Sequence, residues 1–295
     1  MGRRYDTITF LSDLGTADEH VGVVHAIVRD IAPHAHVVDL THAIAPYDVR
    51  AGSLALARAI GYVPSGVVMA VVDAHAGERH AIAIEVAGGE GVVIGPDNGL
   101  LASAVSMAGG AGRTVVLDNR EYQLASPGAP LACRDVFAPI AAHLCNGVDL
   151  TALGTLVDPD TLLPGVVPLP RDTEGGGVQA EVLWIDHLGN CQLNVGLDDV
   201  APWGVAEGVR LEVSAGEVTR VALRVAHIGG LGPGAVGVMV DGYGLLTLAL
   251  DRRSAADELA LATADQVTLR PLAAADQGQG GSVPVAMRPH PAPGR

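Results

Sequence analysis

The stretch "AVVDAHAGERHA", residues 70–81, joins an apolar strand-like run to a dense group of ionisable side chains. The β-branched residues end at Asp73, and a loop of small residues then carries His75, Arg79 and His80. A carboxylate that a guanidinium keeps ionised can orient a water molecule or a substrate. An ion pair that only fastens a loop is the alternative. Small residues let a ligand approach the backbone, so we predict that Asp73 and Arg79 act on a substrate.

Polar residues also follow two other strand-like runs. Asp13 follows "TITFLS", and Asp97 with Asn98 follows "GVVIG". Ligands of open α/β sheets bind beyond the carboxyl ends of the strands, so we predict a shared polar cleft. Asp13 suits two roles equally: it can cap the helix that begins near Asp18, or bind a vicinal diol such as a ribose. "PDNG" is most economically a tight turn.

Two further segments have both a structural and a functional interpretation. "ACRDVFAP" places Arg134 and Asp135 at a helix start, where aspartate suits the positive end of the helix dipole. "IDHLGN" pairs Asp186 with Asn190 across a turn. A simple hairpin explains that pairing, and an amide placed to read a purine edge is the sharper alternative.

The residue types exclude several classes of site. His34 and His36 form an HxH pair, but no spacing supplies the further ligands that a metal needs, so we expect no metal site. The chain has no lysine, which removes Schiff-base chemistry and the phosphate-loop lysine. Three widely spaced cysteines do not form a disulfide framework or a zinc cage.

The composition of the chain limits the classes of partner that it can bind. The chain has 295 residues, 49% of them hydrophobic, and a formal net charge of −15. No basic stripe is available to neutralise phosphates, so nucleic acid is not an expected partner. The apolar stretches are too short to span a bilayer, and no secretory signal follows the N-terminus. We expect a cytoplasmic protein that does not enter membranes.

Strand and helix patterns alternate over residues 1–168. Apolar strands such as "GVVMAVVD" alternate with helical spacing in "DEHVGVVHAIVRDIAP", which ends at a proline. This order predicts an α/β domain with a mostly parallel sheet covered on both faces. Residues 169–177 are expected to be a linker. Short strands joined by turns then predict a smaller antiparallel sandwich or barrel over 178–273, and residues 274–295 a disordered tail.

Several motifs, in order over residues 6–270, resemble one family. This family comprises the adenosine-forming S-adenosyl-L-methionine (SAM) hydrolases, which are also called SAM hydroxide adenosyltransferases. They are related to fluorinase and chlorinase. The resemblance implies an N-terminal α/β/α sandwich domain, a C-terminal β-barrel and a homotrimer with active sites at subunit interfaces. It also implies hydrolysis of SAM to adenosine and L-methionine without a cofactor. The segments are "FLSDLGTADEHVG", "DLTHAIAPYDVRAG", "VVDAHAGERHAI", "GPDNGLL", "CRDVFAPIAAHL", "IDHLGNCQLNV" and "GYGLLTLAL".

The resemblance also implies roles for individual residues. Asp73 and Arg79 fall on the pair that positions the attacking water, whereas the halide-using relatives carry a tyrosine at the Asp73 position. The implied substrate contacts are the ribose hydroxyls for Asp13, the nucleoside for Tyr47, the methionine ammonium for Asp186, the adenine for Leu188 and Asn190, and the methionine carboxylate and the base for the backbone around Gly242, Tyr243 and Arg252.

One segment departs from the family pattern. "PLACRD" places Ala132 where the hydrolases often carry a histidine, and Cys133 at the following glycine. His75 or His80 is the possible substitute. One alternative to hydrolysis is therefore a catalytically weakened protein that binds SAM or adenosine. A halide-dependent 5′-halo-5′-deoxyadenosine synthase is a further alternative, which Asp73 disfavours.

Overall fold

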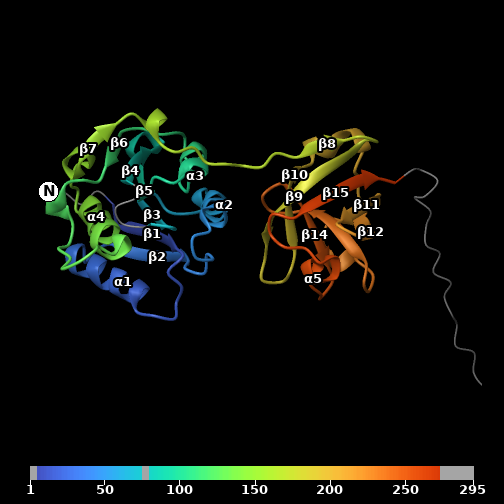
Figure 1. Cartoon of the computed structure of the whole chain (residues 1–295), viewed down its shortest axis with the longest axis horizontal. Coiled ribbons are helices and arrows are strands. Elements are labelled where there is room, and N and C mark those ends of the chain that lie inside the picture. The colour runs from blue at the N-terminus through green and yellow to red at the C-terminus, as the bar shows by residue number, and fades with distance from the viewer. Residues whose placement is uncertain (1–4, 75–79, 273–295) are drawn as a thin grey trace, which may run out of the picture. The chain divides into compact units, whose positions relative to one another are not determined.

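The computed structural model describes residues 5–74 and 80–272, shown in Figure 1. The chain divides into two units between Val167 and Pro168, here called unit 1 and unit 2. His75, Arg79 and the predicted tail 274–295 lie outside the described residues. Among the described residues, no helix combines the length and the apolar character that crossing a membrane requires.

Unit 1 contains a seven-stranded sheet in the order β2-β1-β3-β5-β4-β6-β7. β2, β1, β3 and β5 are parallel, β4 is antiparallel to both β5 and β6, and β6 is antiparallel to β7. All but β4 and β7 therefore run in one direction, which confirms the mostly parallel sheet. The strands are β1 (Thr7–Ser12), β2 (His36–Thr41), β3 (Val67–Val71), β4 (Ala81–Val86), β5 (Gly91–Pro96), β6 (Thr114–Val116) and β7 (Thr155–Val157).

Helices cover both faces of this sheet, with α1 and α4 on one side and α2 and α3 on the other (Figure 1). β3 and β5 are buried along their whole length, as their unbroken apolar sequences predict. In α1, Val24 and Val28 are buried, and the helix ends just before Pro33 because proline cannot continue it. The α/β/α sandwich is thereby confirmed. The helices are α1 (His20–Ile31), α2 (Val49–Ile60), α3 (Ala102–Met107) and α4 (Ala138–Cys145).

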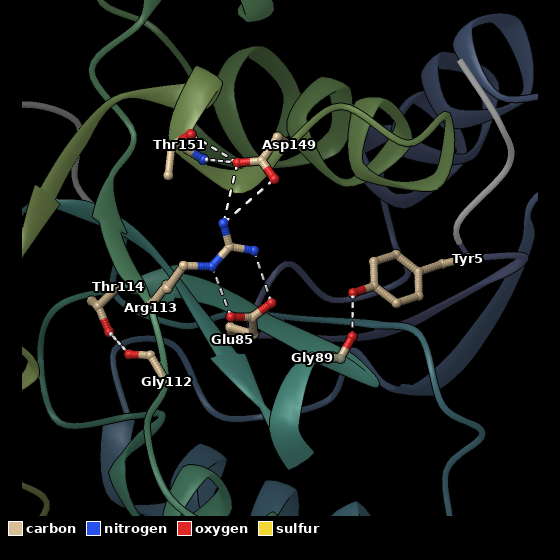
Figure 2. Close-up of polar contacts among 8 residues, drawn as sticks. All are labelled: Tyr5, Glu85, Gly89, Gly112, Arg113, Thr114, Asp149 and Thr151. Atoms are coloured by element: carbon tan, nitrogen blue, oxygen red, sulfur yellow. Dashed lines mark hydrogen bonds and ion pairs between the residues drawn. The ribbon is translucent and has the colours of Figure 1, made fainter.

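An arginine links three segments of unit 1, as Figure 2 shows. Arg113 precedes β6, and its Nε and Nη2 donate to the two carboxylate oxygens of Glu85 in β4, at 2.9 and 3.0 Å. Its Nη1 lies 3.3 Å from Asp149 Oδ1. Asp149 also accepts hydrogen bonds from the backbone N–H and the hydroxyl of Thr151. This cluster fastens β4 and the start of β6 to the segment that follows α4.

Unit 2 is a closed seven-stranded barrel, which confirms the predicted C-terminal β-barrel. Its strand order is β10-β14-β13-β12-β11-β15-β9, and pairing of β9 with β10 closes the ring. All of these pairs are antiparallel except β12–β13. α5 (Ala255–Leu259) follows β14. The strands are β9 (Gly177–Ile185), β10 (Cys191–Gly196), β11 (Arg210–Ala215), β12 (Val218–Arg224), β13 (Val236–Val240), β14 (Leu245–Leu250) and β15 (Gln266–Pro271).

The stretch 169–177, for which we expect a linker, contains one short strand. β8 (Arg171–Thr173) pairs antiparallel with β9. Gly175 and Gly176, both with positive φ, form the turn between the two strands. The sequence analysis missed this hairpin because three polar residues beside a glycine run lack the apolar alternation of a strand.

Candidate active site

Asp13 lies directly after β1 and connects three chain segments. Its Oδ2 accepts hydrogen bonds from the backbone N–H of Tyr47 at 3.0 Å and of Asp73 at 3.1 Å. β1 and β3 are adjacent parallel strands, so Asp13 and Asp73 reach the same edge of the sheet. Tyr47 and Asp73 both have positive φ, 67° and 51°, a conformation that non-glycine residues rarely adopt. The Asp13 carboxylate thus holds two unusual backbone conformations in place.

The other carboxylate oxygen of Asp13 is Oδ1. Among the described residues, Oδ1 has no hydrogen-bond partner. An ionised carboxylate oxygen can accept two hydrogen bonds, so this oxygen can bind a pair of hydroxyls. The Tyr47 side chain is 65% exposed.

Asp97 and Asn98, after β5, serve the backbone instead. Asn98 donates to the carbonyl of Val72 and accepts from the N–H of Leu100, and Asp97 Oδ1 accepts from the N–H of Leu163 at 2.8 Å. Both side chains therefore stabilise loops, in agreement with the tight-turn interpretation.

The lining of a cavity of about 410 Å³ includes Ala74, the residue that follows Asp73 in the sequence. Ala74, His80 and Ala132 all line it, together with Arg120. His80 therefore lines the same cavity as Ala132, the position at which the resemblance implies a histidine. Its suggested alternative, His75, and the predicted catalytic Arg79 are outside the described residues.

Arg134 and Asp135 form a structural pair. The guanidinium donates to both carboxylate oxygens, at 2.6 and 2.9 Å, and the backbone N–H of Leu131 also donates to Asp135. Asp135 is 2% exposed. Burial alone would raise its pKa, but the Arg134 and Leu131 hydrogen bonds outweigh this and lower the pKa. The pair lies in a π-helical turn, Cys133–Phe137, and α4 begins only at Ala138.

In unit 2, Asp186 organises the turn 186–190, here called the Asp186 turn. Its Oδ1 accepts from the N–H groups of Leu188 and Asn190, each at 2.9 Å, and its Oδ2 accepts from Asn190 Nδ2 at 2.8 Å. The hairpin interpretation therefore describes the local structure. One acceptor position on Oδ2 and the amide oxygen of Asn190 stay available to a ligand. Leu188 is 70% exposed.

A second turn repeats this pattern and was missed by the sequence analysis. In the turn 241–245, here called the Asp241 turn, Asp241 Oδ1 accepts from the N–H groups of Tyr243 and Leu245. In both turns the fourth residue is a glycine with φ of 82°, Gly189 or Gly244. The shared spacing D-x-x-G-x in "DHLGN" and "DGYGL" was the available signal. Tyr243 is 53% exposed.

The residues predicted around β14 do not all lie together. Gly242 and Tyr243 precede the strand, whereas Arg252 follows it, and the strand length of six residues separates them by roughly 17 Å. The segment that follows Arg252 contacts the Asp186 turn, since the carbonyl of Gly189 accepts from the N–H of Ala256 at 3.0 Å. Unit 2 therefore presents two groups of predicted contacts, one at each end of β14.

The chain was compared with known proteins. The model of the SAM hydroxide adenosyltransferase N-terminal domain matches residues 8–154, and that of the C-terminal domain matches residues 180–268. A protein of Salinispora tropica named (R)-S-adenosyl-L-methionine hydrolase is 39% identical over 88% of this chain and 96% of its own. A protein of the same name from Thermus thermophilus is 37% identical over 86% and 95%.

More distant relatives and solved structures agree with these matches. A fluorinase of Actinoplanes sp. is 26% identical over 84% of this chain and 91% of its own. The crystal structure of an uncharacterized conserved protein from Thermotoga maritima is 28% identical, covers 89% of this chain and 99% of its own, and superimposes with a TM-score of 0.81. With both domain models matched, this chain belongs to the SAM hydroxide adenosyltransferase family.

Proposed function

We propose that this protein hydrolyses S-adenosyl-L-methionine to adenosine and L-methionine. The observation that carries the proposal is the set of relatives at 37–40% identity over most of both chains, each named (R)-S-adenosyl-L-methionine hydrolase. From their names we extend the proposal to the R configuration at the sulfonium. The fluorinases are 26% identical, and the resemblance implies a tyrosine in the halide-using relatives at the position of Asp73, so we take water as the nucleophile.

The proposed reaction is a direct displacement. The water oxygen forms a bond to the ribose 5′ carbon while the bond from that carbon to sulfur breaks, and its electron pair goes to sulfur. Methionine leaves as a neutral thioether and needs no general acid. The proton of the attacking water passes to Asp73 and then to solvent. Much of the rate would come from placing water and substrate in line.

The predicted substrate contacts are found in both units, and the resemblance implies that they meet at an interface between subunits. In unit 1, Oδ1 of Asp13 accepts the ribose hydroxyls and the exposed Tyr47 ring packs on the nucleoside. In unit 2, the free position of Asp186 accepts the methionine ammonium, and Asn190 and Leu188 contact adenine. The backbone near Gly242, Tyr243 and Arg252 would take the remaining contacts. A homotrimer with interface active sites stays a prediction from the resemblance, and a cytoplasmic location stays a prediction from the sequence.

The test is incubation with each sulfonium epimer of S-adenosylmethionine in ¹⁸O-labelled water, with mass spectrometry of the products. We expect ¹⁸O in the adenosine 5′ hydroxyl, release of methionine and a preference for the R epimer. Asp73→Asn should abolish turnover while adenosine affinity changes little. Asp97→Asn is the matched control because Asp97 also follows a parallel strand but binds the backbone of Leu163. It should remain active.

Other outcomes would separate the alternatives. Tight binding of SAM or adenosine without turnover would support a binding protein that lost catalysis with its histidine. A halogenated nucleoside in the presence of chloride or fluoride would support halide transfer. Unlabelled adenosine would exclude direct attack by water.

A further inference from the structure

A chain of polar side chains lies behind Asp13. Ser12 Oγ is 2.8 Å from His42 Nδ1, and His42 Nε2 is 3.0 Å from Asp39 Oδ1. The same oxygen of Asp39 is 3.0 Å from His25 Nε2. The four residues come from β1, the segment after β2, β2 itself and α1. None of these four residues was predicted as part of a site. Ser12, the last residue in this series of contacts, directly precedes Asp13 in the sequence.

This serine, histidine and aspartate do not form a nucleophilic triad. Ser12 is 0% exposed and His42 is 6% exposed, so no substrate can reach the hydroxyl. Ser12 Oγ also accepts a hydrogen bond from the backbone N–H of Leu14 at 3.3 Å. A serine that is buried and bonded to its own turn suits the positioning of backbone better than attack on a substrate.

The direction of each hydrogen bond follows from Asp39. Burial alone would raise the pKa of Asp39, but the hydrogen bond to His25 and the close contact with the His42 ring outweigh burial and lower that pKa. Nε2 of His42 lies 3.0 Å from the Asp39 carboxylate without the alignment of a hydrogen bond, and this close contact is favourable only when Nε2 carries the proton. In the neutral imidazole Nδ1 is then the acceptor. The Ser12 hydroxyl then donates to Nδ1, and its lone pairs remain free to accept the N–H of Leu14.

His42 contacts both ends of the turn that carries Asp13. Its ring accepts from Ser12 before Asp13, and its backbone carbonyl accepts from the N–H of Gly15 at 2.8 Å after it. Gly15 has a φ of 73°, which favours glycine at the end of this turn. The Phe10 ring packs on the imidazole with centroids 4.5 Å apart. The orientation of the imidazole ring is therefore fixed, and hydrogen bonds to the ring and to the backbone carbonyl of His42 hold the Asp13 turn.

We propose that His42, oriented by Asp39, is a positioning residue that sets the direction of the Asp13 carboxylate through Ser12. The inference rests on the proposed function, in which Oδ1 of Asp13 holds the ribose hydroxyls. It adds a second requirement to that site: the Nδ1 position of residue 42 must accept a hydrogen bond.

Two variants of His42 separate this role from simple packing. The side chain of His42→Asn can place an acceptor where Nδ1 lies and keep the Ser12 contact. The longer side chain of His42→Gln reaches toward the Nε2 position and keeps the Asp39 contact instead. His143→Asn and His143→Gln are matched controls, since His143 also packs on an aromatic ring, that of Tyr122, at 5.2 Å. It has no contact with the Asp13 turn among the described residues.

The full-length variants are compared by calorimetric titration with adenosine, by melting temperature and by kcat and KM for SAM. We expect His42→Gln to weaken adenosine binding by about tenfold, the loss of one hydrogen bond to a site with a charged group, and His42→Asn to stay within about threefold of the unmodified protein. KM for SAM should rise in the same order. The melting temperatures of the two His42 variants should fall together, and the His143 variants should leave adenosine affinity unchanged.

Several results would overturn the positioning role. Equal adenosine affinities for His42→Asn and His42→Gln would contradict it, as would affinities that follow only the melting temperature. Absence of adenosine binding by the unmodified protein would overturn both this inference and the assigned role of Asp13. Failure to hydrolyse SAM, with adenosine affinity still ordered as expected, would overturn the proposed function alone.

Discussion

Asp13 in unit 1 and Asp186 in unit 2 are both carboxylates that bind backbone N–H groups of turns, but at different separations along the chain. The partners of Asp13 are 34 and 60 residues away, whereas the partners of Asp186 are two and four residues away. The first arrangement exists only after the sheet has formed. The second can form within five residues, and the Asp241 turn repeats it.

This difference separates two ways of building a site. The Asp186 turn presents its groups as a local unit on the barrel, so its geometry depends little on the rest of unit 2. The Asp13 site depends on the register of β1 and β3 and on the loop that contains Tyr47. A change at Asp13 should therefore disturb contacts on separate chain segments, including the predicted catalytic Asp73, whereas a change in the Asp186 turn should disturb only the contacts within that turn.

The largest expected effect tests this contrast directly. Asp13→Ala removes a ribose ligand and also releases the backbone of Tyr47 and Asp73, so we expect kcat/KM for SAM to fall by about a hundredfold or more. Asp186→Ala should lower kcat/KM by about tenfold, mostly through KM. Steady-state kinetics of both variants provide the measurement. Comparable losses, divided equally between kcat and KM, would contradict the distinction between the two sites.

The next effect compares the two similar turns of unit 2. A Cβ at Gly189 would lie 2.2 Å from Ser254 Oγ, whereas a Cβ at Gly244 would meet no atom within 4 Å. Both glycines have φ of 82°, so each substitution carries the left-handed penalty of about 1–2 kcal/mol. Gly189→Ala adds overpacking of about 1–3 kcal/mol. We expect the total loss of unfolding free energy to be about 3 kcal/mol for Gly189→Ala.

Urea unfolding followed by tryptophan fluorescence can measure this difference, because both tryptophans, Trp184 and Trp203, are in unit 2. If Gly189→Ala and Gly244→Ala had the same unfolding free energy, the expected clash between the Asp186 turn and Ser254 would be contradicted.

A smaller effect is expected at Arg113, which joins a long-range pair with Glu85 to the local turn of Asp149 (Figure 2). The Arg113 side chain is 40% exposed, so Arg113→Met should lower the unfolding free energy by at most about 1 kcal/mol at neutral pH. Scanning calorimetry at low and high salt would test this. A larger loss that high salt does not reduce would indicate a buried pair instead.

The smallest expected effect is the titration of Asp149. Its pKa is lowered, first by the Thr151 hydroxyl and N–H and then by Arg113, against a burial effect that raises it. Its contribution to stability is therefore complete above the unfolded pKa of 3.8 and is lost as pH falls through the lower folded value. Between about pH 4 and about pH 2, the unmodified protein should lose slightly more stability than Asp149→Asn. Parallel melting curves would contradict this.

Local features of the fold could be predicted from the sequence. The helix that ends before Pro33, the buried β3 and the hairpin in "IDHLGN" all follow from periodicity and turn residues within one short stretch. The shared strand edge also brought Asp13 and Asp73 together as expected, because neighbouring parallel strands end at one side of a sheet.

Non-local features could not be predicted. β4 lies between β5 and β6 and runs against both, and no local pattern encodes that order. The contact of Tyr47 with Asp13 needs a backbone conformation that tyrosine rarely adopts. The chain from His25 through Asp39 and His42 to Ser12 joins residues that are ordinary in their own segments. Only the assembled sheet gives these contacts their meaning.

The three cysteines, one result of the way each core is packed, have a practical consequence. All are buried, and burial raises the pKa of Cys133, and raises those of Cys145 and Cys191 to about 12, so native thiolate is scarce near neutral pH. Maleimide dyes would then label only cysteines introduced on the surface. With Tyr62→Cys in unit 1 and Val221→Cys in unit 2, both exposed positions, single-molecule energy transfer can follow the distance between the units as SAM is added, without first removing any native cysteine.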